Sequence, residues 1–317
     1  MSLSPLEGDH EVSLTPRETE PKNGSHAVKP LLGRAHPVLG SAFGYPRDFL
    51  KNRFVYVVIS PRAGGLSVGV NMNPDQYCNF DCVYCEVDRS HPPTERQLDV
   101  PVMVRELEET IAAVTSGRLR EHSCYKSAPE ELLQLRHVTL SGDGDPTLCP
   151  NFIESVQAVM HVRALGRFPF YKIVLVTNAT GLNQPDVQTG ISFLTNMDEV
   201  WAKLDAGTQA YMEKINRTQV SLEQVLANIL DLARKRPVII QSLFPAINDL
   251  EPPEEEIEEY AQRLLELKRA GAQIPLVQIY SATRPTPNSQ FTHLPLRILS
   301  RIAHKVKKTT GLNAEVF

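Results

Sequence analysis

Apolar residues along the chain fall into short runs that alternate with segments of helical periodicity. Short apolar runs are typical of buried strands, whereas apolar positions three and four residues apart are typical of one face of a helix. The predicted strands are 54–60, 66–71, 137–140, 172–177, 199–204, 237–244 and 276–280. The predicted helices lie around 104–114, 151–164, 184–194, 222–232, 257–265 and 299–306.

This order of elements predicts an α/β fold. The first two strands are joined by the turn Pro61–Gly65, so they form an N-terminal β-hairpin. From there strand and helix alternate six times, which predicts parallel strands with right-handed helical crossovers. An open doubly wound sheet and a full or partial barrel both fit the pattern. In either architecture, ligands bind at the carboxyl ends of the strands.

Length and composition predict one folded domain behind a tail. Residues 1–34 are mostly polar and charged, and we expect them to be disordered, with the domain spanning 35–317. The net charge of −4 gives no overall attraction to DNA or to an anionic membrane, so neither is an expected partner. The start of the chain lacks the features of a secretory signal and the apolar runs are short, which predicts a cytoplasmic protein.

The cysteines carry the strongest chemical signal. There are five, and Cys78, Cys82 and Cys85 follow one another as C-x3-C-x2-C. An odd number in a reducing compartment argues against a disulfide framework and for metal binding or catalysis. Thiolates are ligands for iron–sulfur clusters and zinc. Three on one loop can hold three irons of a cubane, which leaves the fourth iron open to another ligand.

Three other interpretations compete with a cluster. The spacing would put the cysteines on one face of a buried helix, but Pro74 and poor helix formers surround them. Zinc could take His91 as a fourth ligand, although the spacing is not a usual zinc pattern. A redox pair of Cys82 and Cys85 would not need Cys78.

The motif, with Tyr84 before its last cysteine, resembles the signature of the radical S-adenosylmethionine (SAM) enzymes. The resemblance implies a partial (β/α)6 barrel of the TIM type. It also implies that Cys78, Cys82 and Cys85 bind one [4Fe–4S] cluster, whose free iron chelates SAM. Reductive cleavage of SAM would then give a 5′-deoxyadenosyl radical that abstracts hydrogen from a substrate.

Further residues carry the same resemblance. The segment SGDGDPTL at 141–148 is similar to the family's glycine-rich motif, which binds the SAM amino group. Glycine allows close backbone approach, and a carboxylate can accept hydrogen bonds from an ammonium group. Plain turns and solvated loop residues are the alternative interpretation at each position. The implied SAM contacts are Tyr84, Gly142, Asp143, Gly144, Asp145, Asn178, Lys203 and Asp205, with Gln241 and Arg284 as weaker candidates.

More narrowly, the chain resembles a little-characterised bacterial group related to the iron–sulfur oxidoreductases that include tRNA wybutosine-synthesis enzymes. The matching segments include YCNFDCVYC, LSGDGDPTL and VWAKLDAGT, within about 54–317. The resemblance implies an oxidoreductase or transferase that needs an external electron donor, but it names no substrate. A non-enzymatic iron–sulfur or zinc-binding module is the alternative.

Two substrate classes rank equally, a small molecule and RNA, with a peptide behind them. Basic residues in two segments could bind RNA phosphates. The negative net charge favours the alternative that these residues are simply exposed to solvent. A peptide ranks lower because the chain ends directly after the barrel, with no cysteine-rich domain. Cys149 is either a hydrogen-atom donor or a small buried residue, and Cys124 looks incidental. The basic residues are Arg118, Arg120, Lys126, Lys305, Lys307 and Lys308.

Overall fold

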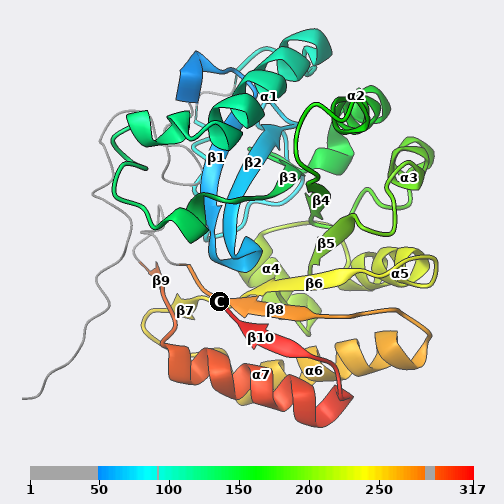
Figure 1. Ribbon diagram of the computed structural model, residues 1–317. Coiled ribbons are helices and arrows are strands. Elements are labelled where there is room, and N and C mark those ends of the chain that lie inside the picture. The colour runs from blue at the N-terminus through cyan, green and yellow to red at the C-terminus, as the bar shows by residue number, and fades with distance from the viewer. Residues whose placement is uncertain (1–48, 91–92, 283–289) are drawn as a thin grey trace, which may run out of the picture. The chain divides into compact units, whose positions relative to one another are not determined.

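Eight strands form one curled sheet in the computed structural model, which describes residues 49–90, 93–282 and 290–317 (Figure 1). Only β1 and β2 pair in antiparallel fashion, and every later neighbour in this sheet is parallel. In sheet order the strands are β1 (Val55–Ser60), β2 (Gly65–Asn71), β3 (Leu135–Ser141), β4 (Lys172–Thr177), β5 (Glu199–Lys203), β6 (Ile239–Leu243), β8 (Val277–Tyr280) and β10 (Ala314–Val316). β7 (Ala246–Ile247) and β9 (Phe291–Thr292) form a separate pair.

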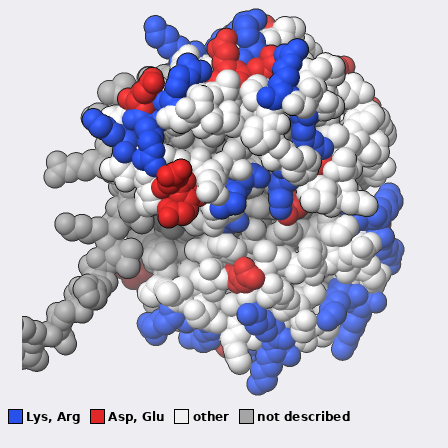
Figure 2. Space-filling model, viewed as in Figure 1, with Lys and Arg blue, Asp and Glu red and all other residues white. Residues whose placement is uncertain are grey.

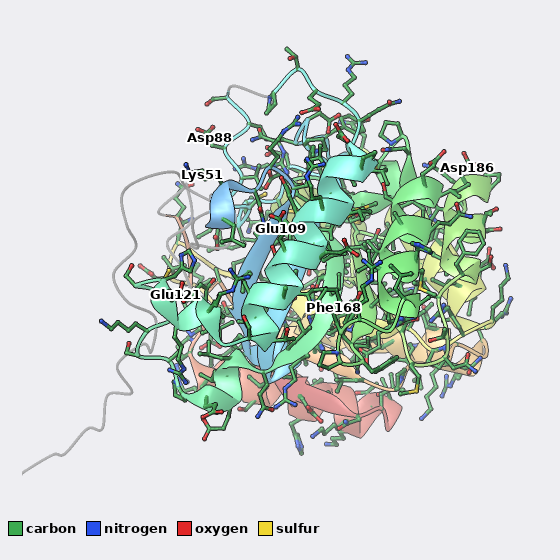
Figure 3. The ribbon with its side chains drawn as sticks, turned by 45° about the horizontal axis from the view of Figure 1, so that its top comes forward. Lys51, Asp88, Glu109, Glu121, Phe168 and Asp186 are labelled. Carbon is green, nitrogen blue, oxygen red and sulfur yellow. The ribbon has the colours of Figure 1, made fainter. Side chains whose placement is uncertain are left out.

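Helices lie along the outer side of this sheet (Figure 1). Figure 3 shows α1, which carries Glu109, running across the outer side of β1 and β2. Asp99 begins α1 by accepting a bond from the main-chain N–H of Val102, and Ser221 begins α5 in the same way. In the described residues the helices are α1 (Val100–Thr115), α2 (Phe152–Ala164), α3 (Pro185–Ser192), α4 (Gln209–Asn216), α5 (Leu222–Ala233), α6 (Glu254–Arg269) and α7 (Leu296–Thr310).

The two faces of the sheet differ in polarity. Successive side chains of a strand point to opposite faces. Val68, Val138 and Ile240 belong to the main apolar core under the helices. Ser67 and Gln241, one position away in β2 and β6, face the inner side and line a cavity there. The alternation therefore builds an apolar layer outside the sheet and a polar surface inside its curl.

The predicted partial barrel of parallel strands behind an N-terminal hairpin is confirmed. Four of the described α-helices and strands are absent from the prediction: α4, a helix of only eight residues with several polar side chains; β10, a three-residue strand at the end of the chain; and the two-residue strands β7 and β9. The predicted tail and its boundary near residue 34 lie outside the described residues. None of the described helices combines the length and the apolar character needed to cross a bilayer.

Asp198 joins helix α2 and strand β4 to the start of β5. Its carboxylate accepts a bidentate pair from Arg163 of α2, at 2.5 and 2.9 Å, and a bond from the main-chain N–H of Ile173 in β4. Its side chain is fully buried. Burial alone would raise the pKa of Asp198, but the bonds from Arg163 and Ile173 outweigh it and lower the pKa.

Asp198→Asn is expected to lower the free energy of unfolding at pH 7 by about 3 kcal/mol, because Arg163 loses its buried partner. A carboxylate with a lowered pKa stabilises the fold above its unfolded pKa, and that contribution disappears as pH falls through the folded value. The gap between native protein and variant should therefore narrow below about pH 4. Urea unfolding across pH 3 to 7 measures it, and a gap independent of pH would contradict the assignment.

Candidate functional site

The cysteine loop lies at the carboxyl end of β2. It leaves the strand after Asn71 and reaches α1 at Val100. Cys78, Cys82 and Cys85 are free thiols, each partly buried. All three line a cavity of about 260 Å³ on the inner side of the sheet.

Nearly all the residues implied as SAM contacts line this same cavity. Gly142 to Asp145 follow β3, Asn178 follows β4, and Lys203 ends β5. Asp205 is the exception, because it lies behind Tyr84 and accepts a hydrogen bond from the Tyr84 hydroxyl. The parallel topology thus brings the predicted residues together, since each follows the carboxyl end of a strand. That they bind SAM stays a prediction.

Each cysteine sulfur accepts an N–H donor. The Cys78 Sγ lies 3.5 Å from the main-chain nitrogen of Phe80 and 3.8 Å from Nδ2 of Asn178. The Cys82 Sγ accepts from Nδ2 of Asn216, the last residue of α4, at 3.3 Å. Hydrogen bonds to cluster sulfurs help to set a cluster's reduction potential.

Arg89 supplies the donor to the third sulfur. Its Nη1 lies 3.3 Å from the Cys85 Sγ. Its Nε and Nη2 donate to the carbonyl oxygens of Gln76 and Asp143, at 3.0 and 2.9 Å. Arg89 therefore ties both ends of the cysteine loop to the glycine-rich segment and places a positive charge beside a thiol.

Burial keeps two of the thiols neutral when no metal is bound. It raises the pKa of Cys78 to about 12, with a further contribution from Asp145. It raises the pKa of Cys82 to about 11, with Asp205 adding to the effect. Metal ligation requires the thiolate, so binding at this loop would release protons.

The donor set fits an iron–sulfur cubane. Within the described ranges, no three His, Cys, Asp or Glu side chains converge as ligands of a single ion. A cubane makes a different demand, because each thiolate binds a different iron and the sulfurs surround the cluster instead of one point. Three thiols that face one cavity, each with an N–H donor, meet that demand.

Glycine-rich backbone packs directly on the cysteine loop. A Cβ on Gly144 would lie 1.8 Å from the carbonyl oxygen of Tyr77. The next residue, Asp145, donates its main-chain N–H to that same oxygen at 3.2 Å. Only glycine permits this approach, so Gly144 fixes the loop against the end of β3.

Both oxygens of the Asp145 carboxylate accept hydrogen bonds from other residues of the chain. Oδ1 accepts from the main-chain N–H of Thr147 at 2.9 Å, which begins the 3-10 helix Pro146–Leu148. Oδ2 accepts from the main-chain N–H of Asn178 at 2.5 Å, and the Thr177 hydroxyl reaches both oxygens. Burial raises the pKa of Asp145 against the effect of these bonds. Asp145 therefore joins the glycine-rich segment to the end of β4.

Lys203 and Asp205 form a buried ion pair beneath Tyr84. The Lys203 Nζ lies 3.6 Å from Oδ1 of Asp205 and 3.2 Å from the Tyr280 hydroxyl oxygen. Burial lowers the pKa of Lys203, but Asp205, Tyr280 and Cys82 together outweigh burial and the net shift is upward, so Lys203 is a cation. Oδ2 of Asp205 also accepts from Nδ2 of Asn216 at 3.0 Å.

Sequence reasoning missed Asn216 and Arg89. Asn216 ends a helix that was not predicted, and Arg89 lies in a polar loop without periodicity, so only the fold shows what they contact. His91 and Arg284 lie outside the described residues. Cys149 is buried in the apolar core and does not line the cavity, whereas Cys124 is exposed.

Comparisons with known sequences point to a little-characterised group. No family model matches the chain. A UPF0026 protein of Synechocystis is 28% identical over 240 residues, which cover 74% of this chain and 77% of that protein. A UPF0026 protein of Helicobacter pylori is 26% identical over 185 residues, 57% of this chain and 52% of that protein.

Solved structures give the clearer result. A radical SAM methyltransferase from Sphaerobacter thermophilus matches with a TM-score of 0.55 at 15% identity, over 83% of this chain and 68% of its own. Streptococcus suis SuiB bound to S-adenosylmethionine matches with a TM-score of 0.55 at 13% identity, over 77% of this chain and 49% of its own. TYW1 with a lysine–pyruvate adduct bound matches with a TM-score of 0.50 at 15% identity, over 78% of this chain and 74% of its own. The predicted resemblance is thus confirmed, and the chain has the fold of the radical SAM enzymes.

Proposed function

We propose that this protein is a radical SAM enzyme that binds one [4Fe–4S] cluster through Cys78, Cys82 and Cys85. The observation that carries the proposal is the shared cavity. Three thiols with separate N–H donors face the same space as the carboxyl ends of β3, β4 and β5. When bound, the cluster would supply the electron that cleaves SAM. An external electron donor is part of the proposal.

The chain's own residues would bind and orient SAM. Lys203, a buried cation, suits the carboxylate of SAM. Both oxygens of Asp145 already accept bonds within the chain, so we assign the ammonium contact to Asp143 and the backbone of Gly142 and Gly144, which line the cavity. Tyr84 would close one wall of the site because its hydroxyl is held by Asp205.

A small-molecule substrate is the first choice. The cavity of about 260 Å³ lies below the range of about 300–1,000 Å³ that is typical of ligand sites, which favours a small ligand. Basic side chains on the face seen in Figure 2 lie in separate groups divided by uncharged and acidic ones. Lys305, one of the residues considered for RNA phosphates, pairs with Glu254 and Glu258. RNA, which ranks equally with a small molecule from the sequence, is therefore the second candidate.

Cleavage of SAM is the direct test. After anaerobic reconstitution with iron and sulfide, dithionite and SAM are expected to give 5′-deoxyadenosine, measured by chromatography. Cys82→Ala should abolish the product because it removes one of three cluster ligands, whereas Cys124→Ala, which changes an exposed cysteine, should keep it. A stable zinc site without sulfide would favour the binding-module alternative and would overturn the proposal.

Asn216→Leu is expected to make the midpoint potential of the reconstituted cluster more negative. The variant removes the N–H donor to the Cys82 sulfur, and that donor favours the more negatively charged, reduced state of the cluster; the variant also removes the bond from Asn216 to Asp205. Loss of one hydrogen bond of about 1 kcal/mol corresponds to a shift on the order of 50 mV for a one-electron couple. Redox titration followed by electron paramagnetic resonance measures it.

Asn228→Leu is the matched control for this shift. Asn228 is a buried amide like Asn216, but it donates to the carbonyl oxygens of Ala179 and Thr180 instead of to sulfur. Its replacement should leave the midpoint potential unchanged. Equal shifts in the two variants would mean that general loosening of the fold, and not the bond to sulfur, changes the potential.

A further inference from the structure

Arg62 reaches the cavity from the segment between β1 and β2, where the sequence predicts a turn. It lies in the 3-10 helix Pro61–Ala63 between β1 and β2. Its guanidinium carbon lies 4.2 Å from the centre of the Tyr280 ring at the end of β8. In the sheet β2, β3, β4, β5 and β6 separate β1 from β8, so this contact crosses the inner side of the curl. Arg62 and Tyr280 both line the cavity.

Arg62 is a cation without a counter-charge in the part of the chain that the structure describes. Its Nε is buried and has no hydrogen-bond partner there. The other two cations of the cavity wall have partners of their own, because Lys203 lies beside Asp205 and is assigned to SAM, and Arg89 donates to Cys85 and two carbonyl oxygens. Burying a charged donor without a partner is costly, so a ligand that supplies an acceptor at Arg62 would be favoured.

Apolar side chains also line the cavity that Arg62 faces. Val58, Val176 and Trp201 line the same cavity. The His137 ring meets the Trp201 ring edge-on, with centroids 5.5 Å apart. Burial lowers the pKa of His137 to about 4, helped by Lys172 and Arg62, so His137 adds no charge at neutral pH. Arg62 is therefore the uncompensated charge facing this part of the cavity.

We propose that Arg62 binds a carboxylate group of a small-molecule substrate, with the Tyr280 ring holding the guanidinium in place; this inference rests on the proposed function. A guanidinium and a carboxylate match as two parallel hydrogen bonds, and an aromatic face supports the planar cation. One uncompensated cation suits a monoanion. A phosphate monoester, which carries about −1.5 to −2 charges near neutral pH, calls for more positive charge than Arg62 supplies.

The Arg62 subsite is separate from the proposed SAM contacts. Arg62 precedes β2, whereas the cysteine loop follows it, so the two reach the cavity from opposite ends of that strand. The carboxylate of SAM is assigned to Lys203, whose Nζ lies 3.2 Å from the Tyr280 hydroxyl oxygen, whereas the Arg62 guanidinium lies over the Tyr280 ring. A carboxylate at Arg62 would thus place the apolar body of a substrate against Val58, Val176 and Trp201.

Trp201 offers a direct readout because it is the one tryptophan of the chain and lines the cavity. We would titrate the protein, without cluster or SAM, with sodium acetate, butyrate and hexanoate at constant ionic strength and follow its fluorescence. A saturable change is expected, with tighter binding of the longer acids. Arg62→Gln should weaken the apparent affinity at least about tenfold, because hydrogen bonds between charged groups are lost.

Two further variants sharpen the result. Arg62→Lys keeps the charge but loses the planar fork, so its affinity should fall between those of native protein and Arg62→Gln. Arg118→Gln removes the charge of an exposed arginine elsewhere and should bind like native protein. Thermal unfolding establishes that each variant is folded.

Several outcomes would overturn the inference. These are no saturable change with any carboxylate, equal binding by Arg62→Gln and native protein, or tighter binding of inorganic phosphate or of bulk tRNA than of the acids. The titration uses neither cluster nor SAM, so it is independent of the cleavage assay. Carboxylate binding without SAM cleavage would contradict the proposed function but not the carboxylate subsite. SAM cleavage without carboxylate binding would contradict the carboxylate subsite but not the proposed function.

Discussion

Asp205 is the buried carboxylate on which the geometry of the site depends. Its oxygens accept from the Tyr84 hydroxyl in the cysteine loop, from Asn216 at the end of α4 and from the main-chain N–H of Leu243 in β6. Lys203 of β5 balances its charge. A buried carboxylate is tolerated only when its charge is paired and its lone pairs are filled. Satisfying Asp205 therefore requires the loop, the helix and two strands to be in register at once.

The sequence predicted most of the strands and the cysteine loop because their signals are local. Apolar runs such as 172–177 mark strands by composition, and Cys78, Cys82 and Cys85 stand within one short segment. The parallel topology then implied that strand ends meet at one edge. Asn178 and Lys203 follow this rule, and both line the cavity with the cysteines.

Roles that depend on long-range contacts could not be predicted from the sequence. Asn216 and Arg89 have no local pattern that separates them from other polar residues, yet they donate to cysteine sulfurs. Arg62 looked like part of a turn because nothing nearby in the sequence shows that the sheet curls far enough to bring it onto Tyr280. Asp145 shows the reverse case. Its motif predicts a contact with SAM, which stays a prediction, and the motif does not show that the carboxylate also accepts bonds from Thr147 and Asn178 within the fold.

Charge is distributed unevenly along the cavity, and this gives its two regions different chemistry. Near the cysteine loop, burial raises the pKa of Cys78 and Cys82. N–H donors, including that of Arg89, lie within hydrogen-bond distance of the cysteine sulfurs. The Cys78 and Cys82 thiols are neutral before a metal binds, and the oriented donors favour the negative charge that develops when these thiols ionise. Around Arg62 the opposite holds, since the wall carries a positive charge before any ligand arrives. A metal that displaces protons suits the first region, and a ligand that arrives as an anion suits the second.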